Sequence, residues 1–172
     1  MRISAPITGY LTNALHDLVA RHGRFVTGIQ NIMKSSNQVI NNSAVLANDN
    51  DFAFSVGVSD VVTLMLILIL GTGANAGWKF AFTVPAGANI YGVVTDDIGP
   101  IAAGNLTGWT DLATGKSYAS VAAVNWTALI LANYMSGGTS GIVRFKWAQQ
   151  SAQAVNTTLY KQSSMLIMSQ SA

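Results

Sequence analysis

Apolar side chains recur at helical spacing in the first 42 residues. Successive intervals of four and three residues separate Leu11, Leu15, Leu18, His22, Phe25, Ile29 and Ile32. This is the spacing of a heptad seam, but Gly23 and Gly28 fall within it, and each weakens a helix by about 1 kcal/mol relative to Ala. The pattern predicts an N-terminal helical or extended arm over residues 1–42. It could be one amphipathic helix lying on the body, two short helices broken at Gly23, or a short stalk where helices of several subunits meet.

From about residue 43 onward the apolar positions change to a period of two. Phe80 and Phe82 alternate with basic or small residues before Pro85, and Phe145 and Trp147 alternate with Arg and Lys. Alternation of this kind predicts half-buried β-strands. Several short strands separated by turn residues predict a jelly-roll-like β-sandwich of about eight strands over residues 43–172. Phe80, Phe82, Phe145 and Trp147 are expected in its core.

The segment over residues 61–70 is apolar almost throughout. It is too short for a membrane helix, which needs about 20 residues, and it predicts a strand covered on both faces. Because one sandwich core covers only one face, the other is expected to meet a neighbouring subunit. The predicted oligomer interface consists of Val62, Leu64, Leu66 and Leu68, and the predicted assembly is a homotrimer.

Composition agrees with a strand-rich, self-associating protein. Only 9% of the 172 residues are charged, against about 25% in typical domains. All acidic residues are Asp, which favours turns over helices. The net charge of +2 and the scattered basic residues predict neither a nucleic-acid nor a membrane partner. Cysteine is absent, so disulfides and thiolate chemistry are excluded.

A glycine-rich segment, GTGANAG over residues 71–77, follows the apolar strand as a dinucleotide-binding loop would. Asp96 and Asp97 lie about 20 residues later, where a ribose-binding acid is found in such folds. A dinucleotide site also needs a helix after the glycines. The residues that follow alternate with period two, so we expect a flexible hairpin turn and no cofactor.

Candidate metal ligands are few. His16 and His22 lie six residues apart, which puts them on different faces of a helix. Oxygen ligands in residues 48–51 (NDND) could hold calcium, but the later acidic ligand and the glycine of a calcium loop are missing. A turn before Phe52 is the simpler interpretation. With no catalytic, cofactor or metal constellation, the sequence predicts a protein that is not an enzyme.

Three strand segments resemble a family of small tailed-phage virion proteins. They are LANDNDFAFSVG over residues 46–57, WKFAFTVPAGA over 78–88, and GIVRFKWAQQS over 141–151, the last followed by VNTTLY (155–160) and SSML (163–166). The first is similar to an Asp-rich turn before an alternating strand. The others are similar to an aromatic strand ending in a Pro-x-Gly turn, and to the closing strands of that family. The resemblance spans about residues 46–168.

The resemblance implies a jelly-roll-like module of the virion, commonly trimeric and without an active site. The first interpretation is a decoration or cement protein that binds the major capsid protein and stabilises the assembled head by mass action. The arm would supply the partner contacts through Leu11, Leu15, Leu18, Phe25, Ile29 and Ile32. The alternative is a fibre or tail-tip module that recognises the host surface, for which Trp109 in the turn-rich segment 95–116 is the candidate sugar-stacking residue. Either interpretation predicts a virion location, after assembly in the host cytoplasm.

Overall fold

The computed structural model describes residues 25–96, 107–119 and 123–171, and within them it is built of strands without a helix. This confirms the all-β prediction. Accordingly, none of the described residues belongs to a helix long and apolar enough to cross a membrane. In chain order the strands of this described part are β1 (Phe25–Met33), β2 (Gln38–Asn41), β3 (Ala47–Val56), β4 (Val61–Thr72), β5 (Trp78–Thr83), β6 (Asn89–Asp96), β7 (Thr107–Asp111), β8 (Lys116–Tyr118), β9 (Val124–Met135), β10 (Gly141–Ala148), β11 (Asn156–Leu159) and β12 (Ser164–Ser171).

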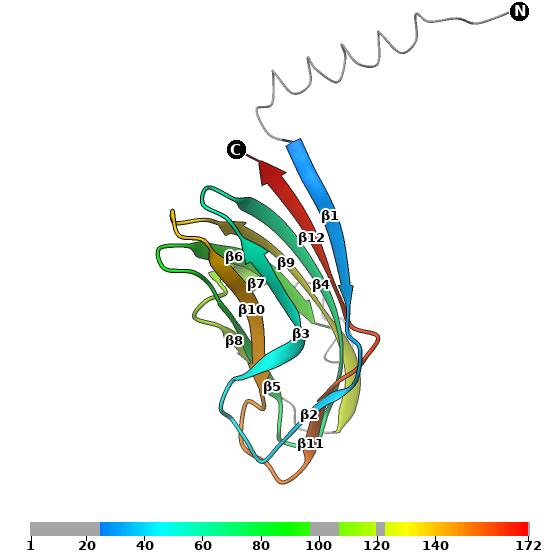
Figure 1. Cartoon of the computed structure of the whole chain (residues 1–172). Coiled ribbons are helices and arrows are strands. Elements are labelled where there is room, and N and C mark those ends of the chain that lie inside the picture. The colour runs from blue at the N-terminus through cyan, green and yellow to red at the C-terminus, as the bar shows by residue number, and fades with distance from the viewer. Residues whose placement is uncertain (1–24, 97–106, 120–122, 172) are drawn as a thin grey trace, which may run out of the picture.

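The strands form two curled antiparallel sheets that face each other (Figure 1). The larger sheet has the order β1-β12-β4-β9-β6-β7, and the short strands β2 and β11 extend it beside the end of β4. The smaller sheet has the order β3-β10-β5-β8. Chain neighbours such as β3 and β4, or β9 and β10, lie in opposite sheets, so the glycine-rich link at residues 136–141 crosses between layers and does not close a hairpin.

The strand pairs are nested along the chain. β6 pairs with β7, β5 with β8, β4 with β9, and β3 with β10, and outside these β2 pairs with β11 and β1 with β12. The chain is therefore one long two-stranded ribbon whose apex joins β6 to β7. Rolling this ribbon places β10 beside β5 and β9 beside β6. The result is the double-sheet jelly roll predicted from the sequence, with an extra ladder of β1 and β12 on one edge.

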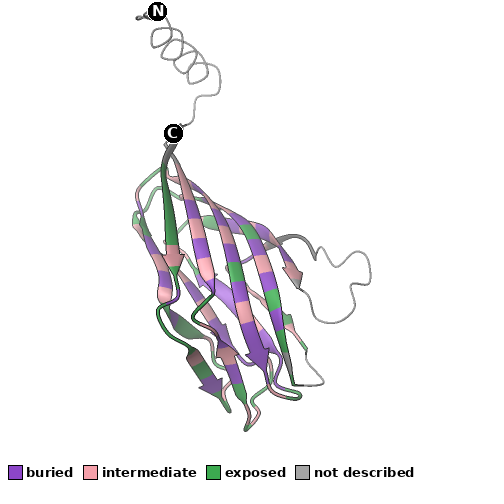
Figure 2. Ribbon diagram, turned by 90° about the vertical axis from the view of Figure 1, so that its right-hand side faces the viewer, coloured by how far each residue is buried: buried purple, intermediate pink, exposed green. Residues whose placement is uncertain are grey.

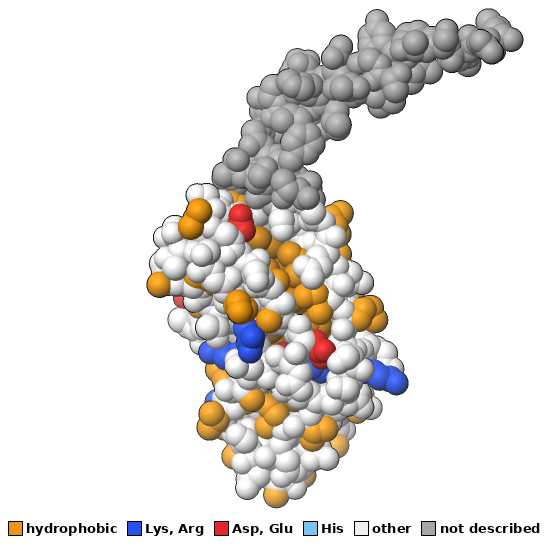
Figure 3. Space-filling model, in the orientation of Figure 1, with side chains coloured by type: hydrophobic (Ala, Val, Ile, Leu, Met, Phe, Trp, Pro, Cys, Tyr) orange, Lys and Arg blue, Asp and Glu red, His pale blue; other side chains and the backbone are white. Residues whose placement is uncertain are grey.

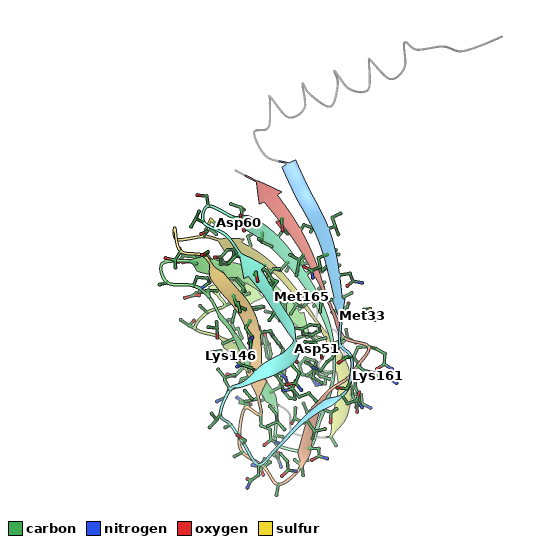
Figure 4. The ribbon with its side chains drawn as sticks, in the orientation of Figure 1. Met33, Asp51, Asp60, Lys146, Lys161 and Met165 are labelled. Atoms are coloured by element: carbon green, nitrogen blue, oxygen red, sulfur yellow. The ribbon has the colours of Figure 1, made fainter. Side chains whose placement is uncertain are left out.

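The space between the sheets is filled mainly by aromatic and branched side chains. Phe80, Phe82, Phe145 and Trp147 are all at most 2% exposed, which confirms the predicted core. Phe145 stacks on Phe80 and meets Phe82 and Phe52 edge to face. Met165 of β12 faces the same interior, between the layers (Figure 4).

From Phe25 onward the N-terminal segment is extended, so only the helical form of the predicted arm over residues 1–42 is wrong there. β1 and β2 are strands of the larger sheet, and β1 pairs with β12 from Phe25↔Ser171 to Met33↔Ser164. Three of the six predicted arm contacts, Phe25, Ile29 and Ile32, therefore belong to the body, which begins at β1 and not at residue 43. The edge of β12 offers backbone hydrogen bonds to an extended segment, which favours a strand here. Gly28 destabilises a helix more than it destabilises a strand at an irregularity in the pairing. Leu11, Leu15 and Leu18 lie outside the described residues.

Candidate functional site

The two faces of β4 are used differently. Val62, Leu64, Leu66 and Leu68 are at most 1% exposed and point into the sandwich core, so the predicted oligomer interface on these four residues is wrong. The opposite face carries the side chains at odd positions, among them Met65, Ile67 and Ile69. Successive strand residues point to opposite sides, and both parities of this segment are apolar, so the sequence could not tell the inner face from the outer one.

Residues of neighbouring strands extend the outer face of β4 into one surface. In the register of the sheet, Leu166 of β12 lies opposite Met65, Met65 opposite Leu131 of β9, and Leu131 opposite Val93 of β6. We call the outer face of β1, β12, β4, β9 and β6 the outer sheet face. It is turned toward the viewer in Figure 2, where bands of differing burial alternate along each strand. Its apolar members are Ile29, Met33, Val61, Met65, Ile67, Ile69, Tyr91, Val93, Leu129, Leu131, Met135, Leu166 and Met168.

The exposure of this face is unusual for apolar side chains. Ile29 is 70% exposed, Met33 58%, Leu131 41% and Ile67 38%. Contiguous exposed apolar surface of this kind marks interaction sites in soluble proteins.

No charged side chain is found among the described residues of the outer sheet face, whose polar members are Asn, Ser and Thr. The smaller sheet differs, because Lys79, Arg144 and Lys146 lie on its outer side, alternating with buried aromatic residues. Figure 3 shows that charged side chains are few on the face of the molecule that it presents, and Figure 4 labels Lys146, Lys161, Asp51 of β3 and Asp60 of the β3–β4 turn. Charge is thus absent from the described side chains of these five strands, and Asp111 of β7, opposite Tyr91, borders the outer sheet face.

A polar groove lies at one end of the larger sheet. It is lined by Gly71, Thr72, Gly73, Ala123, Asn125, Asn156, Thr158 and Tyr160, and its open volume is about 350 Å³. A Cβ on Gly71 would lie 2.7 Å from the Tyr160 hydroxyl and 2.8 Å from Asn125 Oδ1, so the missing side chain lets these groups close over the strand. The Tyr160 hydroxyl is 3.4 Å from Asn125 Oδ1, and Asn41 donates to Asn156 Oδ1 at 2.9 Å. The lining offers amide and hydroxyl groups without charge.

The Asp-rich segment 48–51, a calcium candidate or a turn by sequence, lies within β3, so the prediction of a turn is wrong, and its acids contact an internal cation. Lys34 Nζ, at the end of β1, is 2.8 Å from Asp49 Oδ2 and 3.3 Å from Asp51 Oδ2. The side chains of Lys34 and Asp49 are both fully buried, and Asp49 Oδ1 accepts the backbone N–H groups of Asp51 and Phe52. No group of three potential metal-ligating side chains is found in the part of the chain that the structure describes. The ammonium thus takes the place that a metal ion would hold.

Electrostatics around Asp51 follow from the same contacts. Burial acts to raise the pKa of Asp51, but the hydrogen bonds from Ser35 and Lys34 and the charge of Lys34 outweigh it. The pKa therefore lies below its usual value of 3.8.

The structure tests some of the remaining candidate site residues named from the sequence. Residues 73–77 form the turn between β4 and β5, with positive φ at Asn75 and Gly77, and a strand follows. The turn is confirmed, but it is not the predicted hairpin turn, because β4 and β5 lie in different sheets. Trp109 lies in β7, but its side chain, like Asp97, His16 and His22, falls outside what the structure describes.

No protein-family model matches the chain, and no curated protein matches it. Among solved structures, the chain is similar to the tripod (BppUct-A-L) from the baseplate of bacteriophage Tuc2009, with 14% sequence identity and a TM-score of 0.32. The likeness covers 80% of this chain, which spans 65% of the length of that one. A TM-score this low carries no argument, so the fold stands on the strand pairing described above.

Proposed function

We propose that the protein is a non-catalytic structural subunit of a tailed-phage particle, acting as a homotrimer in a fibre or the tail. The observation that carries the assembly role is the uncharged, apolar outer sheet face, which a single chain leaves open. The strand-and-turn resemblance of residues 46–168 to small virion proteins supports the phage origin. A rigid jelly-roll body suits a part whose task is to bind and not to catalyse.

The fibre or tail position is favoured over the capsid position for two reasons. The cement interpretation depended on an arm over residues 1–42 that binds the major capsid protein, and half of its named contact residues belong to β1 and its sheet. The groove beside Gly71, in contrast, offers neutral amide and hydroxyl groups with a tyrosine ring. Such a lining suits a polyhydroxylated ligand such as a glycan of the host surface.

Immunogold electron microscopy tests the location. An antibody raised against the purified chain should label the tail or its fibres on intact particles of the phage that encodes it. Label confined to the head would support the cement interpretation instead. Particles without label, together with the absence of the chain from their mass-spectrometric inventory, would overturn the virion assignment.

The glycan interpretation of the groove has its own test. Saturation-transfer NMR with glucose, galactose, rhamnose and N-acetylglucosamine should give signals from at least one sugar. Replacing the hydroxyl through Tyr160→Phe, or the amide through Asn125→Ala, should reduce that signal, whereas the control variant Ser117→Ala, on the smaller sheet, should keep it. Equal signals from all variants would exclude the groove as the binding site.

A further inference from the structure

The chain leaves one face of its larger sheet uncovered, and the register makes that face continuous. Leu166, Met65, Leu131 and Val93 form a row across four strands. Ile67 and Leu129 form the next row toward the groove. Interfaces of permanent oligomers resemble a domain core cut in half, and they are depleted of charge. The outer sheet face has both properties.

The polar groups of this face are compatible with burial. Thr63 Oγ1 donates to Asn133 Oδ1 at 2.9 Å, so the hydroxyl donor on β4 and the amide oxygen on β9 are paired within one chain. A buried polar group is costly mainly when it loses its hydrogen-bond partner. Covering this pair therefore removes no existing hydrogen bond.

The size of the face matches the requirement of a specific interface. β4 has 12 residues, which at about 3.4 Å per residue gives a length of roughly 40 Å. Five strands spaced about 4.8 Å apart span roughly 20 Å, so the face measures roughly 800 Å². A standard interface buries about 800 Å² on each partner.

A second copy of the chain is the occupant that fits these features. It brings an equally uncharged surface, so no charge on either side has to be removed from water. A closed ring of like subunits, with this face turned toward the ring axis, would cover it.

We infer that the outer sheet face is the contact between copies of this chain, an inference that rests on the proposed assembly role and gives it a surface. The core side of β4 lies behind this contact and takes no direct part in it; it carries Val62, Leu64, Leu66 and Leu68. The charged outer side of the smaller sheet, with Arg144 and Lys146, stays free for solvent or other partners.

The first test introduces a charge on the face. Light scattering coupled to size exclusion should find the wild-type chain as an oligomer at micromolar concentration. Ile67→Glu should weaken self-association by more than about tenfold, because the oligomer would bury an unpaired charge. The control Ile142→Glu changes a residue that is 52% exposed on the smaller sheet, and it should leave the mass unchanged. A monomeric wild type, or an Ile67→Glu variant of undiminished mass, overturns the inference.

A second measurement guards against a variant that fails to fold. Because the natural chain has no cysteine, Ile67→Cys and Ile142→Cys each carry a single thiol. A maleimide should label Ile142→Cys rapidly and Ile67→Cys slowly, and dilution to the monomer should remove the difference. Rapid labelling of both variants in the native assembly would contradict the inference.

The outcomes separate this inference from the proposed function. A monomer that immunogold labelling nevertheless finds on particles would overturn the sheet interface and the homotrimer, but not the virion role. An oligomer with a protected Ile67 position, absent from particles, would overturn only the virion role.

Discussion

At the scale of single residues, one buried cation links two strands. Lys34 joins the end of β1 to β3 through Asp49 and Asp51, and its ammonium also lies 5.6 Å from the centre of the Phe52 ring. From the sequence, the two acids are predicted to lie in a turn, whereas they lie in β3, and nothing marks Asp49 as the partner of a lysine 15 residues earlier. Nothing in the spacing marks Lys34 as buried, since lysine is almost never fully buried unless it is paired.

Removing the cation should destabilise the fold strongly. Lys34→Met leaves the fully buried Asp49 without its partner, and breaking such a pair costs about 3–5 kcal/mol. Urea denaturation should show this as a lower midpoint. The double variant Lys34→Met/Asp49→Asn should recover part of the loss, because an amide oxygen can still accept the backbone N–H groups. The control Lys161→Met, on an exposed turn, should change little, and a Lys34→Met variant as stable as wild type would refute the assignment.

The same cluster predicts a dependence of stability on acid. The folded pKa of Asp51 lies below its usual 3.8, so its ionised form is favoured by folding. Its contribution is complete above the unfolded pKa and is lost as the pH falls through the folded one. Between pH 6 and 2, the denaturation midpoint of wild type should therefore fall more steeply than that of Asp51→Asn. Parallel curves for the two proteins would show that Asp51 contributes nothing through its charge.

At the scale of elements, β1 shows where sequence reasoning succeeds and fails. The strands of the body were predictable because Phe80, Phe82, Phe145 and Trp147 alternate cleanly with polar or small residues. β1 was not, since Ile29 and Ile32 are spaced as on one face of a helix, whereas in the strand this odd spacing puts them on opposite faces of the sheet. The deciding contact is the ladder to β12, whose residues lie at the other end of the chain.

Truncation distinguishes the strand from an arm. A chain beginning at Ser43 lacks β1 and β2, exposes the edge of β12, and leaves Asp49 without Lys34. It should lose cooperative thermal unfolding, as followed by circular dichroism. A chain beginning at Arg24 retains both strands and should unfold near the wild-type temperature. If the shorter chain were equally stable, β1 would be dispensable to the body.

At the scale of the whole molecule, the nested ribbon makes folding depend on distant contacts. β1 must find β12, and β3 must find β10, before either ladder is stable. Loop closure is costly for such pairs, and all-β domains dominated by non-local pairing fold on the order of milliseconds to seconds. Stopped-flow refolding, monitored by the buried tryptophans Trp78 and Trp147, should fall in this range at concentrations below assembly. Refolding within microseconds would contradict a nested order of assembly.

The outermost ladder also gives the body two unlike poles (Figure 1). Phe25 and Ser171 are paired at one pole, beside Val61, where β1 begins and β12 ends. At the other pole, the end of β4 meets β11 and the groove beside Gly71. The 12 residues of β4 set the two poles roughly 40 Å apart. If the particle binds the protein through the residues that precede β1, the groove points away from the attachment. A fluorescent tag fused after β12 would then lie at the attached pole and would not obstruct the groove.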